Sequence, residues 1–185
     1  MIKIIAGRWK RRNLTVLNRK TLRPTPAKVR ETIFNWLSSR IDLSNSNVLD
    51  LFCGSGSLGI EAASRGARQV TLIDSDKQVI DQLNYFIRGL GNPENIKTHC
   101  KEALAWLTLN QNKKFDLIFL DPPFDSSLLK KTLPNLSCQV SSGGLVYVEY
   151  DNSIDFMLDS LGFEIICASK SGTIRYYLIM KKNFC

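Results

Sequence analysis

Short, mostly apolar runs alternate with longer helix-like segments along most of the chain. The runs have the length of strands, and this alternation predicts a parallel sheet built from βαβ units. The expected strands are residues 47–52, 69–74, 96–100, 115–120 and 145–150, and the expected helices are residues 26–40, 57–65, 76–90, 102–110 and 127–139. Thr25 is a suitable N-cap for the first helix, with Pro26 at its first helical position.

The two ends of the chain depart from this alternation. Residues 163–169 and 173–180 are separated by only Lys170-Ser171-Gly172, too few residues for a parallel crossover, so they predict a hairpin that ends the sheet with an antiparallel strand. Residues 2–5 and 14–17 read as two strands around a turn. We therefore expect a β-hairpin extension over residues 1–24 and one α/β domain over residues 25–185.

A glycine-rich turn follows the strand expected at residues 47–52. Residues 53–59 read Cys-Gly-Ser-Gly-Ser-Leu-Gly, which places Gly54, Gly56 and Gly59 in G-x-G-x-x-G spacing between a strand and a helix. The next strand ends in Asp74, twenty residues after Gly54, where an acid commonly binds ribose hydroxyls. The pattern indicates a nucleoside-bearing cofactor, but its spacing does not say which one.

Asp50, near the end of the strand before the turn, narrows the choice of cofactor. A carboxylate there would repel the pyrophosphate of a dinucleotide, whereas it suits the cationic ammonium group of S-adenosylmethionine. The alternative is that the Asp50 side chain turns back and caps the amides of the glycine turn. A second motif favours the methyl donor.

The second motif is Asp121-Pro122-Pro123-Phe124, directly after the strand expected at residues 115–120. Two prolines offer carbonyls but no N–H groups, and Asp121 adds a carboxylate, so this rim accepts hydrogen bonds. A planar amine could donate one N–H to Asp121 and one to the Pro122 carbonyl while its ring lies on Phe124. The alternative is a strand that simply ends in a Pro-Pro turn.

Several blocks of the sequence resemble known enzymes. Residues 50–62 are similar to the cofactor loop of class I methyltransferases, and residues 121–124 to the (Asp/Asn)-Pro-Pro-aromatic motif of enzymes that methylate exocyclic amines of bases. Residues 4–14 and 22–37 resemble segments of the RsmD family, the bacterial enzymes that methylate N2 of one guanine in 16S ribosomal RNA. The resemblance spans about residues 2 to 150. It implies an α/β, Rossmann-like class I methyltransferase fold, with a mostly parallel seven-stranded sheet and an antiparallel C-terminal strand.

The resemblance also implies site residues and a cofactor, S-adenosylmethionine. Asp74 would hold the ribose hydroxyls, and Glu102 and the Ala103 amide would lie near the adenine, although Asp or Asn is common in the family at position 102. The expected cofactor-binding residues are Asp50, Cys53, Gly54, Ser55, Gly56, Asp74, Ser75, Glu102, Ala103 and Asp121, and the expected catalytic residues are Asp121, Pro122, Pro123 and Phe124.

Positive charge is concentrated at the N-terminus. Residues 1–30 hold ten Lys or Arg and no acid, whereas the whole chain has a net charge of +8. Such a patch attracts a polyanion, and Trp9 within it could stack on an unpaired base. The expected RNA-binding residues are Arg8, Trp9, Lys10, Arg11, Arg12, Arg23 and Lys28. A merely solvated charge run is the alternative for individual residues.

The remaining composition excludes several classes of protein. The five cysteines are odd in number and lack C-x-x-C spacing, so neither a disulfide framework nor a metal site is expected. No apolar run approaches the ~18 residues of a membrane span, and there is no signal-peptide pattern. We expect a monomeric cytoplasmic enzyme that acts on 16S ribosomal RNA, free or within the assembled small subunit. The alternatives are methylation of another amine, such as adenine N6 or a glutamine amide, and an RNA-binding module without activity.

Overall fold

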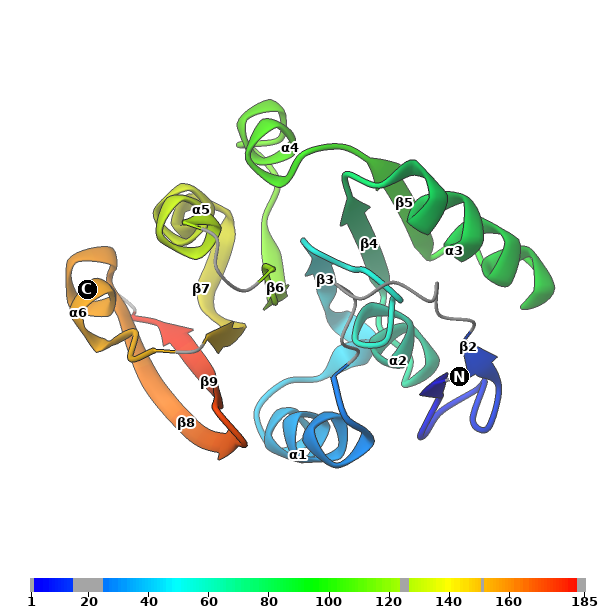
Figure 1. The fold of residues 1–185 in the computed structure, drawn as a ribbon, viewed down its shortest axis with the longest axis horizontal. Helices are drawn as coiled ribbons and strands as arrows, with labels where there is room; N and C mark the ends of the chain where they lie inside the picture. Colours follow the sequence, from blue (N-terminus) through cyan, green and yellow to red (C-terminus); the bar gives the residue numbers. More distant parts are fainter. Residues whose placement is uncertain (1, 15–24, 124–126, 151, 183–185) are drawn as a thin grey trace.

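The computed structural model describes residues 2–14, 25–123, 127–150 and 152–182 (Figure 1). Within this part of the chain, seven strands form one sheet in the order β5-β4-β3-β6-β7-β9-β8. The strands are β3 Asn47–Asp50, β4 Gln69–Asp74, β5 Ile96–Cys100, β6 Phe115–Leu120, β7 Val140–Tyr150, β8 Phe163–Ser171 and β9 Ile174–Lys181. Strands β3 to β7 pair in parallel and β9 is antiparallel to both of its neighbours. The predicted α/β fold is confirmed.

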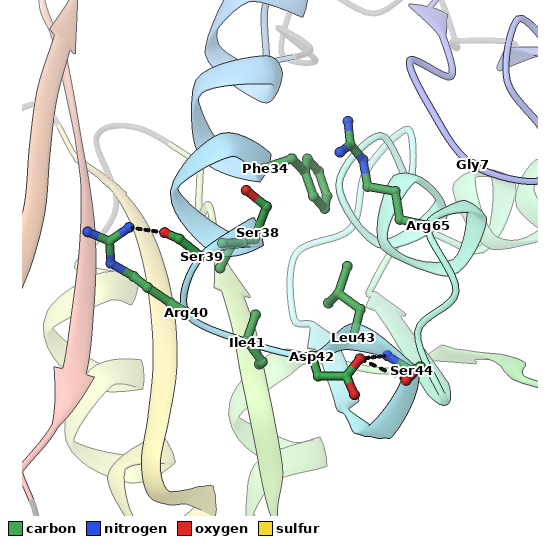
Figure 2. Close-up of a pocket in the computed structure, with 11 residues that line it drawn as sticks. Gly7, Phe34, Ser38, Ser39, Arg40, Ile41, Asp42, Leu43, Ser44 and Arg65 are labelled. Atoms are coloured by element: carbon green, nitrogen blue, oxygen red, sulfur yellow. Dashed lines mark hydrogen bonds between the residues drawn. The ribbon is translucent and has the colours of Figure 1, made fainter.

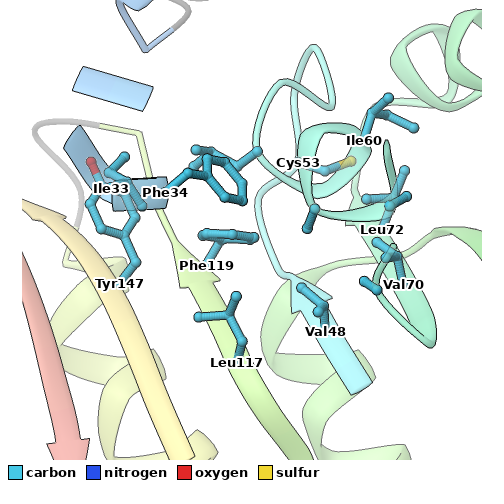
Figure 3. Packing of buried hydrophobic residues seen from close by; sticks show 14 of the residues in the cluster. Ile33, Phe34, Val48, Cys53, Ile60, Val70, Leu72, Leu117, Phe119 and Tyr147 are labelled. Atoms are coloured by element: carbon cyan, nitrogen blue, oxygen red, sulfur yellow. The ribbon is translucent and has the colours of Figure 1, made fainter. Parts of the chain in front are cut away.

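Helices cover both faces of the sheet. They are α1 Ala27–Ser38, α2 Gly59–Ser64, α3 Lys77–Gly89, α4 Ala103–Leu109, α5 Leu128–Leu136 and α6 Asp155–Leu161, with 3-10 turns η1 Leu43–Asn45 and η2 Ser137–Gln139. Because side chains alternate along a strand, Val48 packs in the cluster with α1, α2 and α3, whereas Leu49 packs in the cluster with α4, α5 and α6. In the first cluster Phe119 lies between Phe34 and Tyr147, at centroid distances of 6.0 and 6.2 Å (Figure 3).

The observed elements differ from the sequence expectations near the C-terminus. Strand β7 begins at Val140 rather than near residue 145, because a register shift lets Phe115 pair with Val140 and Leu117 with Leu145. Gly143, with φ of 67°, lies in the bulged stretch between those pairs. Helix α6 was not expected from the sequence. The antiparallel strand is β9, and it lies between β7 and β8. The strand at this edge of the sheet is therefore β8, and not the antiparallel strand that the sequence predicted there.

The N-terminal segment packs tightly against α2. Strand β1 Ile2–Lys3 pairs antiparallel with β2 Asn13–Leu14. The carboxylate of Glu61, fully buried in α2, accepts hydrogen bonds from the amides of Ile5 and Ala6 at 2.7 and 2.9 Å. Ile2, Ile4, Trp9 and Leu14 join the core cluster under α1 to α3. This basic segment is therefore held in a fixed place relative to α2, the helix that follows the glycine turn.

Within the described residues, none of the helices has the length and apolar character needed to cross a membrane.

Candidate cofactor and substrate site

Asp50 bonds the residue that ends the glycine-rich turn. Its side chain is buried, and Oδ2 accepts a hydrogen bond of 2.9 Å from the amide of Gly59. A Cβ at Gly59 would lie 2.3 Å from Leu72 Cδ2 and 3.0 Å from Asp50 Oδ2, so only glycine fits there. The alternative interpretation, that Asp50 caps a turn amide, is thus confirmed for this oxygen. Burial raises the pKa of Asp50 to about 7, with a further rise from the Asp74 charge, against the opposing hydrogen bond from Gly59.

Asp74 holds the other side of the same turn. Its Oδ2 accepts from the Gly54 amide and its Oδ1 from the Asp76 amide, both at 2.9 Å. Gly54 and Gly56 have φ of 48° and 74°, in the left-handed region that favours glycine. Each carboxylate oxygen of Asp74 has a second lone pair, so the group can accept from ribose hydroxyls while it holds the turn.

The other expected cofactor residues lie around these two acids. Cys53 is buried, its amide donates to the Ile73 carbonyl at 2.9 Å, and burial raises the pKa of its thiol, so it packs as a neutral small side chain. Ser75 and Glu102 are exposed, and Ala103 begins α4. Ser55 is half-buried. The binding roles of all these residues stay predictions.

Asp121 directly follows β6, next to the end of β3. The register pairs Asp50 with Phe119, and the Leu51 amide donates to the Phe119 carbonyl at 3.2 Å, so the two acids end neighbouring strands. Asp121 is half-buried, Pro122 buried and Pro123 exposed. Burial raises the pKa of Asp121 well above its ordinary value, and the charges of Glu149 and then Asp50 raise it further. Phe124 lies outside the described residues.

Glu149 is a site residue that the sequence analysis missed. It lies near the end of β7, where Leu120 pairs with Val148, so Asp121 and Glu149 occupy the next positions on adjacent strands. Its Oε1 accepts hydrogen bonds from the Tyr147 hydroxyl at 2.7 Å and the Thr25 hydroxyl at 3.2 Å. Burial raises the pKa of Glu149, and these two hydrogen bonds oppose the rise. The available signal was an acid at the end of an apolar run, the same pattern as at Asp50.

The prediction that Thr25 caps α1 is wrong, because Thr25 bonds Glu149 instead. Thr25 makes no capping bond, since its hydroxyl donates to Glu149 and the N-cap position is Pro26 without a side-chain cap. The N-terminus of α1 is thereby tied to the acid beside Asp121.

Three carboxylates consequently end three adjacent strands. Asp50, Asp121 and Glu149 follow or end β3, β6 and β7, which are neighbours in the sheet, and all have raised pKa values chiefly because they are buried. Such an edge disfavours a phosphate and favours a cation, which would stabilise the ionised form of each carboxyl. The chemistry of this donor set fits a ligand with an ammonium and a sulfonium group.

The expected RNA-binding residues fall into two groups. Arg8, Lys10, Arg11, Arg12 and Lys28 are exposed. Trp9 is different: it is only 7% exposed and belongs to the core, with the Arg8 guanidinium carbon 5.7 Å from its ring centroid. The ring that we expected to stack on a base is therefore buried, and that expectation is corrected. Arg23 lies outside the described residues.

A hollow of about 750 Å³ lies beside the C-terminal end of α1 (Figure 2), before the N-terminal end of β3, whereas Asp50 is at the C-terminal end of that strand. It is lined by the end of α1 and by residues 39–44, which lead into the start of β3. Its charged groups already have partners: Arg65 Nε bonds Glu61 at 2.8 Å, Arg40 bonds the Trp36 carbonyl at 2.8 Å, and Asp42 accepts from Ser44. We assign no chemistry to it.

Comparison with known proteins shows the family of this chain. The model of a family described as Conserved hypothetical protein 95 matches residues 2–180. The chain belongs to this family. Relatives named Ribosomal RNA small subunit methyltransferase D include one from Buchnera aphidicola, 37% identical over 185 residues, which cover 98% of this chain and 93% of the relative. Another, from Haemophilus influenzae, is 42% identical over 153 residues, which cover 80% of this chain and 78% of the relative.

A solved structure is similar over nearly the whole fold. The Escherichia coli protein yhhF, described as a proposed methyltransferase, superposes with a TM-score of 0.84 at 32% identity, covering 98% of each chain. The family match and the named relatives confirm the resemblance seen in the sequence, and the fold is that of the class I methyltransferases.

Proposed function

We propose that this protein transfers a methyl group from S-adenosylmethionine to the exocyclic N2 amine of a guanine in small-subunit ribosomal RNA. The observation that carries the proposal is the position of Asp121, at the end of β6 between the acids that end β3 and β7. Two relatives over most of the chain bear the name of a small-subunit ribosomal RNA methyltransferase. The protein would act in the cytoplasm as a monomer, on RNA that is free or assembled.

The residues around the glycine turn fit the cofactor. Asp50 lies under the turn and would attract the ammonium group, and Asp74 would accept hydrogen bonds from the ribose hydroxyls. Ser75 and the residues after β5, Glu102 and Ala103, would flank the base. The bound cofactor would supply an electrophilic methyl group on a cationic sulfonium.

Asp121 and the Pro122 carbonyl would orient the amine. The lone pair of guanine N2 is delocalised into the ring, so the enzyme must hold the nitrogen in line with the methyl group. Two accepted N–H bonds fix that orientation. During transfer a nitrogen–carbon bond forms, the sulfur–carbon bond breaks with its electron pair left on sulfur, and positive charge develops on nitrogen. The half-buried carboxylate of Asp121 would stabilise that charge, and Asp121 together with the buried Glu149 would accept the departing proton.

A methylation assay tests the proposal. The protein is incubated with labelled S-adenosylmethionine and with either free 16S ribosomal RNA or small subunits from cells that lack the family enzyme, and the nucleosides are separated. We expect N2-methylguanosine from at least one substrate. N6-methyladenosine would support the adenine alternative, and labelled protein would support a glutamine amide. Binding of RNA with no transfer to any substrate would indicate an RNA-binding module.

A further inference from the structure

A groove separates the N-terminal hairpin from helix α3. It has a volume of about 640 Å³ and is open to solvent between two segments far apart in the sequence, which lie at the right of Figure 1. Its lining residues are Arg11, Arg12 and Asn13 of the hairpin and Gln82, Tyr85, Phe86, Arg88, Gly89 and Leu90 of α3 and its C-terminus. Three arginines and no acid line it, so the groove is suited to an anion.

Tyr85 is an unusual residue on the wall of this groove. Its side chain is 75% exposed, and among the described residues only Leu109 is a comparably exposed large hydrophobic residue. Tyr85 thus contributes little to the core, whereas an exposed ring in a groove that arginines also line is a typical stacking platform for an unpaired base. Helix α3 buries Val79, Leu83 and Ile87 on its other side, so Tyr85 is held on a rigid element.

Arg11 provides a second, independent observation. Its φ of 71° lies in the left-handed region, and its amide donates to the Ile4 carbonyl at 2.9 Å, which fixes that conformation in the turn. The other described non-glycine residue with positive φ is Asn92, a type that tolerates it. A long side chain at a position that suits glycine is strained, and such strain is typical of functional residues. Arg11 is one of the residues that line the groove.

We propose that this groove binds a single-stranded stretch of the RNA substrate, with Tyr85 stacked on an unpaired base and Arg11, Arg12 and Arg88 on the flanking phosphates. The choice of RNA as the anion rests on the proposed function. This proposal gives an RNA-binding role to Tyr85 and Arg88 of α3. The sequence analysis assigned them no role, because in the sequence they look like the ordinary polar face of an amphipathic helix.

The groove lies away from the reacting centre. Helix α3 begins at Lys77, just after Asp74 of the cofactor turn, and Tyr85 to Gly89 form its other end. Thirteen helical residues span about 20 Å, so RNA in the groove is held at a distance from the target base. The groove therefore contributes to affinity for the RNA that flanks the target, and not to the chemical step.

Binding of a single-stranded oligoribonucleotide, measured against salt, tests the proposal. Tyr85→Ala should lower the affinity about 5- to 150-fold, the stacking energy of one base expressed as an affinity ratio, with the salt slope unchanged. Arg88→Ala should flatten the slope by roughly 0.7 for the lost phosphate contact. The matched control is Leu109→Ala, which removes an equally exposed side chain on α4 and should bind like the parent.

Arg11→Gly separates binding from folding. Glycine relieves the strain at φ of 71°, so the thermal midpoint should stay level or rise while RNA affinity and salt slope fall. A lower midpoint with unchanged RNA binding would assign Arg11 a purely structural role and overturn its part in the groove. Equal affinity for a duplex of the same length would overturn the stacking role of Tyr85.

The outcomes also separate the groove from the proposed function. If Tyr85→Ala and Arg88→Ala bind like Leu109→Ala while the parent methylates ribosomal RNA, the groove proposal is wrong and the proposed function stands. If the parent binds the oligoribonucleotide through Tyr85 and Arg88 but methylates no RNA, the groove stands and the proposed function fails.

Discussion

Glu149 on β7 and Asp121 at the end of β6 occupy neighbouring positions, one residue beyond the pair that Leu120 forms with Val148. Each of these carboxyls has a raised pKa because it is buried, and the charge of Glu149 raises the pKa of Asp121 further. Since like charges in a desolvated site cannot both ionise easily, the pair retains a proton to higher pH than either acid would alone. The carboxyl assigned to the amine thus has a neighbour that controls its protonation.

Replacement of Asp121 tests its assigned role. Asp121→Ala should lower methyl transfer by about 10²-fold or more, as expected for loss of an electrostatic contact at a reacting centre, while most of the affinity for S-adenosylmethionine is retained. Single-turnover transfer and calorimetric titration measure the two quantities. Asp159→Ala, which removes an acid that is 94% exposed, is the control. Turnover of Asp121→Ala within a few-fold of the parent would contradict the assignment.

The dependence of the methyl-transfer rate on pH should reflect the ionisation of Asp121 and Glu149. Transfer requires ionised Asp121, so the rate should fall at low pH as this carboxyl becomes protonated. Because the pKa of Asp121 is raised, this acidic limb of the pH–rate profile should lie at a higher pH than an ordinary aspartate would give. Glu149→Gln removes the neighbouring negative charge, so the pKa of Asp121 should fall and the limb should move to lower pH. Glu164→Gln removes an exposed glutamate on β8 and should leave the limb in place. An unchanged limb in Glu149→Gln would show that the two acids do not share a proton during the reaction. The groups that act on the pair are Asp50, Tyr147 and the hydroxyl of Thr25.

The stability of the ligand-free protein should depend on Asp50. The pKa of this carboxyl is about 7 in the folded state and about 3.9 in an unfolded chain, so the folded state binds the proton more tightly. Its contribution to the free energy of unfolding is greatest below about pH 4 and is lost as pH rises through about 7, a change on the order of 4 kcal/mol.

Denaturant unfolding of the parent and Asp50→Asn between pH 4 and 8 measures this contribution. The difference in stability between the two proteins should shift in favour of Asp50→Asn as pH rises. S-adenosylmethionine should reduce the shift in the parent, because a bound cation favours the ionised carboxyl. Parallel stability curves without ligand would show that Asp50 has an ordinary pKa.

The burial of Trp9 changes what its replacement should do. Trp9→Ala removes a ring that is only 7% exposed and packs in the core, so it should lower the free energy of unfolding by about 3–5 kcal/mol. Thermal and denaturant unfolding measure the loss. Any loss of RNA affinity should come only from displacement of the N-terminal hairpin from α2. A variant as stable as the parent that nevertheless binds RNA weakly would restore the stacking role.

Exposed charge in the hairpin should behave differently from Trp9. Replacing Arg8, Lys10, Arg11 and Arg12 together with Ala should weaken RNA binding and reduce its salt slope by roughly 0.7–0.9 per lost phosphate contact. S-adenosylmethionine binding should be retained, because its expected contacts begin at Asp50. Unchanged RNA affinity and slope would mean that the hairpin is a solvated charge run.

The sequence predicted the fold where local pattern and tertiary structure coincide. Strands β4 and β6 match the expected ranges because each is a mostly buried run that ends in a turn, and β5 matches although only Ile96 of it is buried. The hydrogen bond between the Gly54 amide and Asp74 was not expected from the spacing of these residues. Local pattern could not show where Thr25 would point, since its partner Glu149 lies 124 residues away. Nor could it show that Trp9, among basic residues, packs on a distant helix.

The same limit applies to the site. The sequence can show that an acid lies at the end of a single strand. It does not show that Asp50, Asp121 and Glu149 are neighbours, because that depends on the order of the strands in the sheet. Strand order depends on crossover connections, which the spacing of residues does not encode. The groove between the hairpin and α3 was beyond sequence analysis for the same reason, because its two walls are more than sixty residues apart.

The central claim is that Asp121 directs methyl transfer to guanine N2 in small-subunit ribosomal RNA. The most direct measurement is a map of N2-methylguanosine in 16S ribosomal RNA from three strains: one lacking this gene, one with the gene restored and one restored with Asp121→Ala. We predict that one N2-methylguanosine is absent from the first strain, present in the second and absent or greatly reduced in the third. A methylation map that is the same in all three strains would contradict the account.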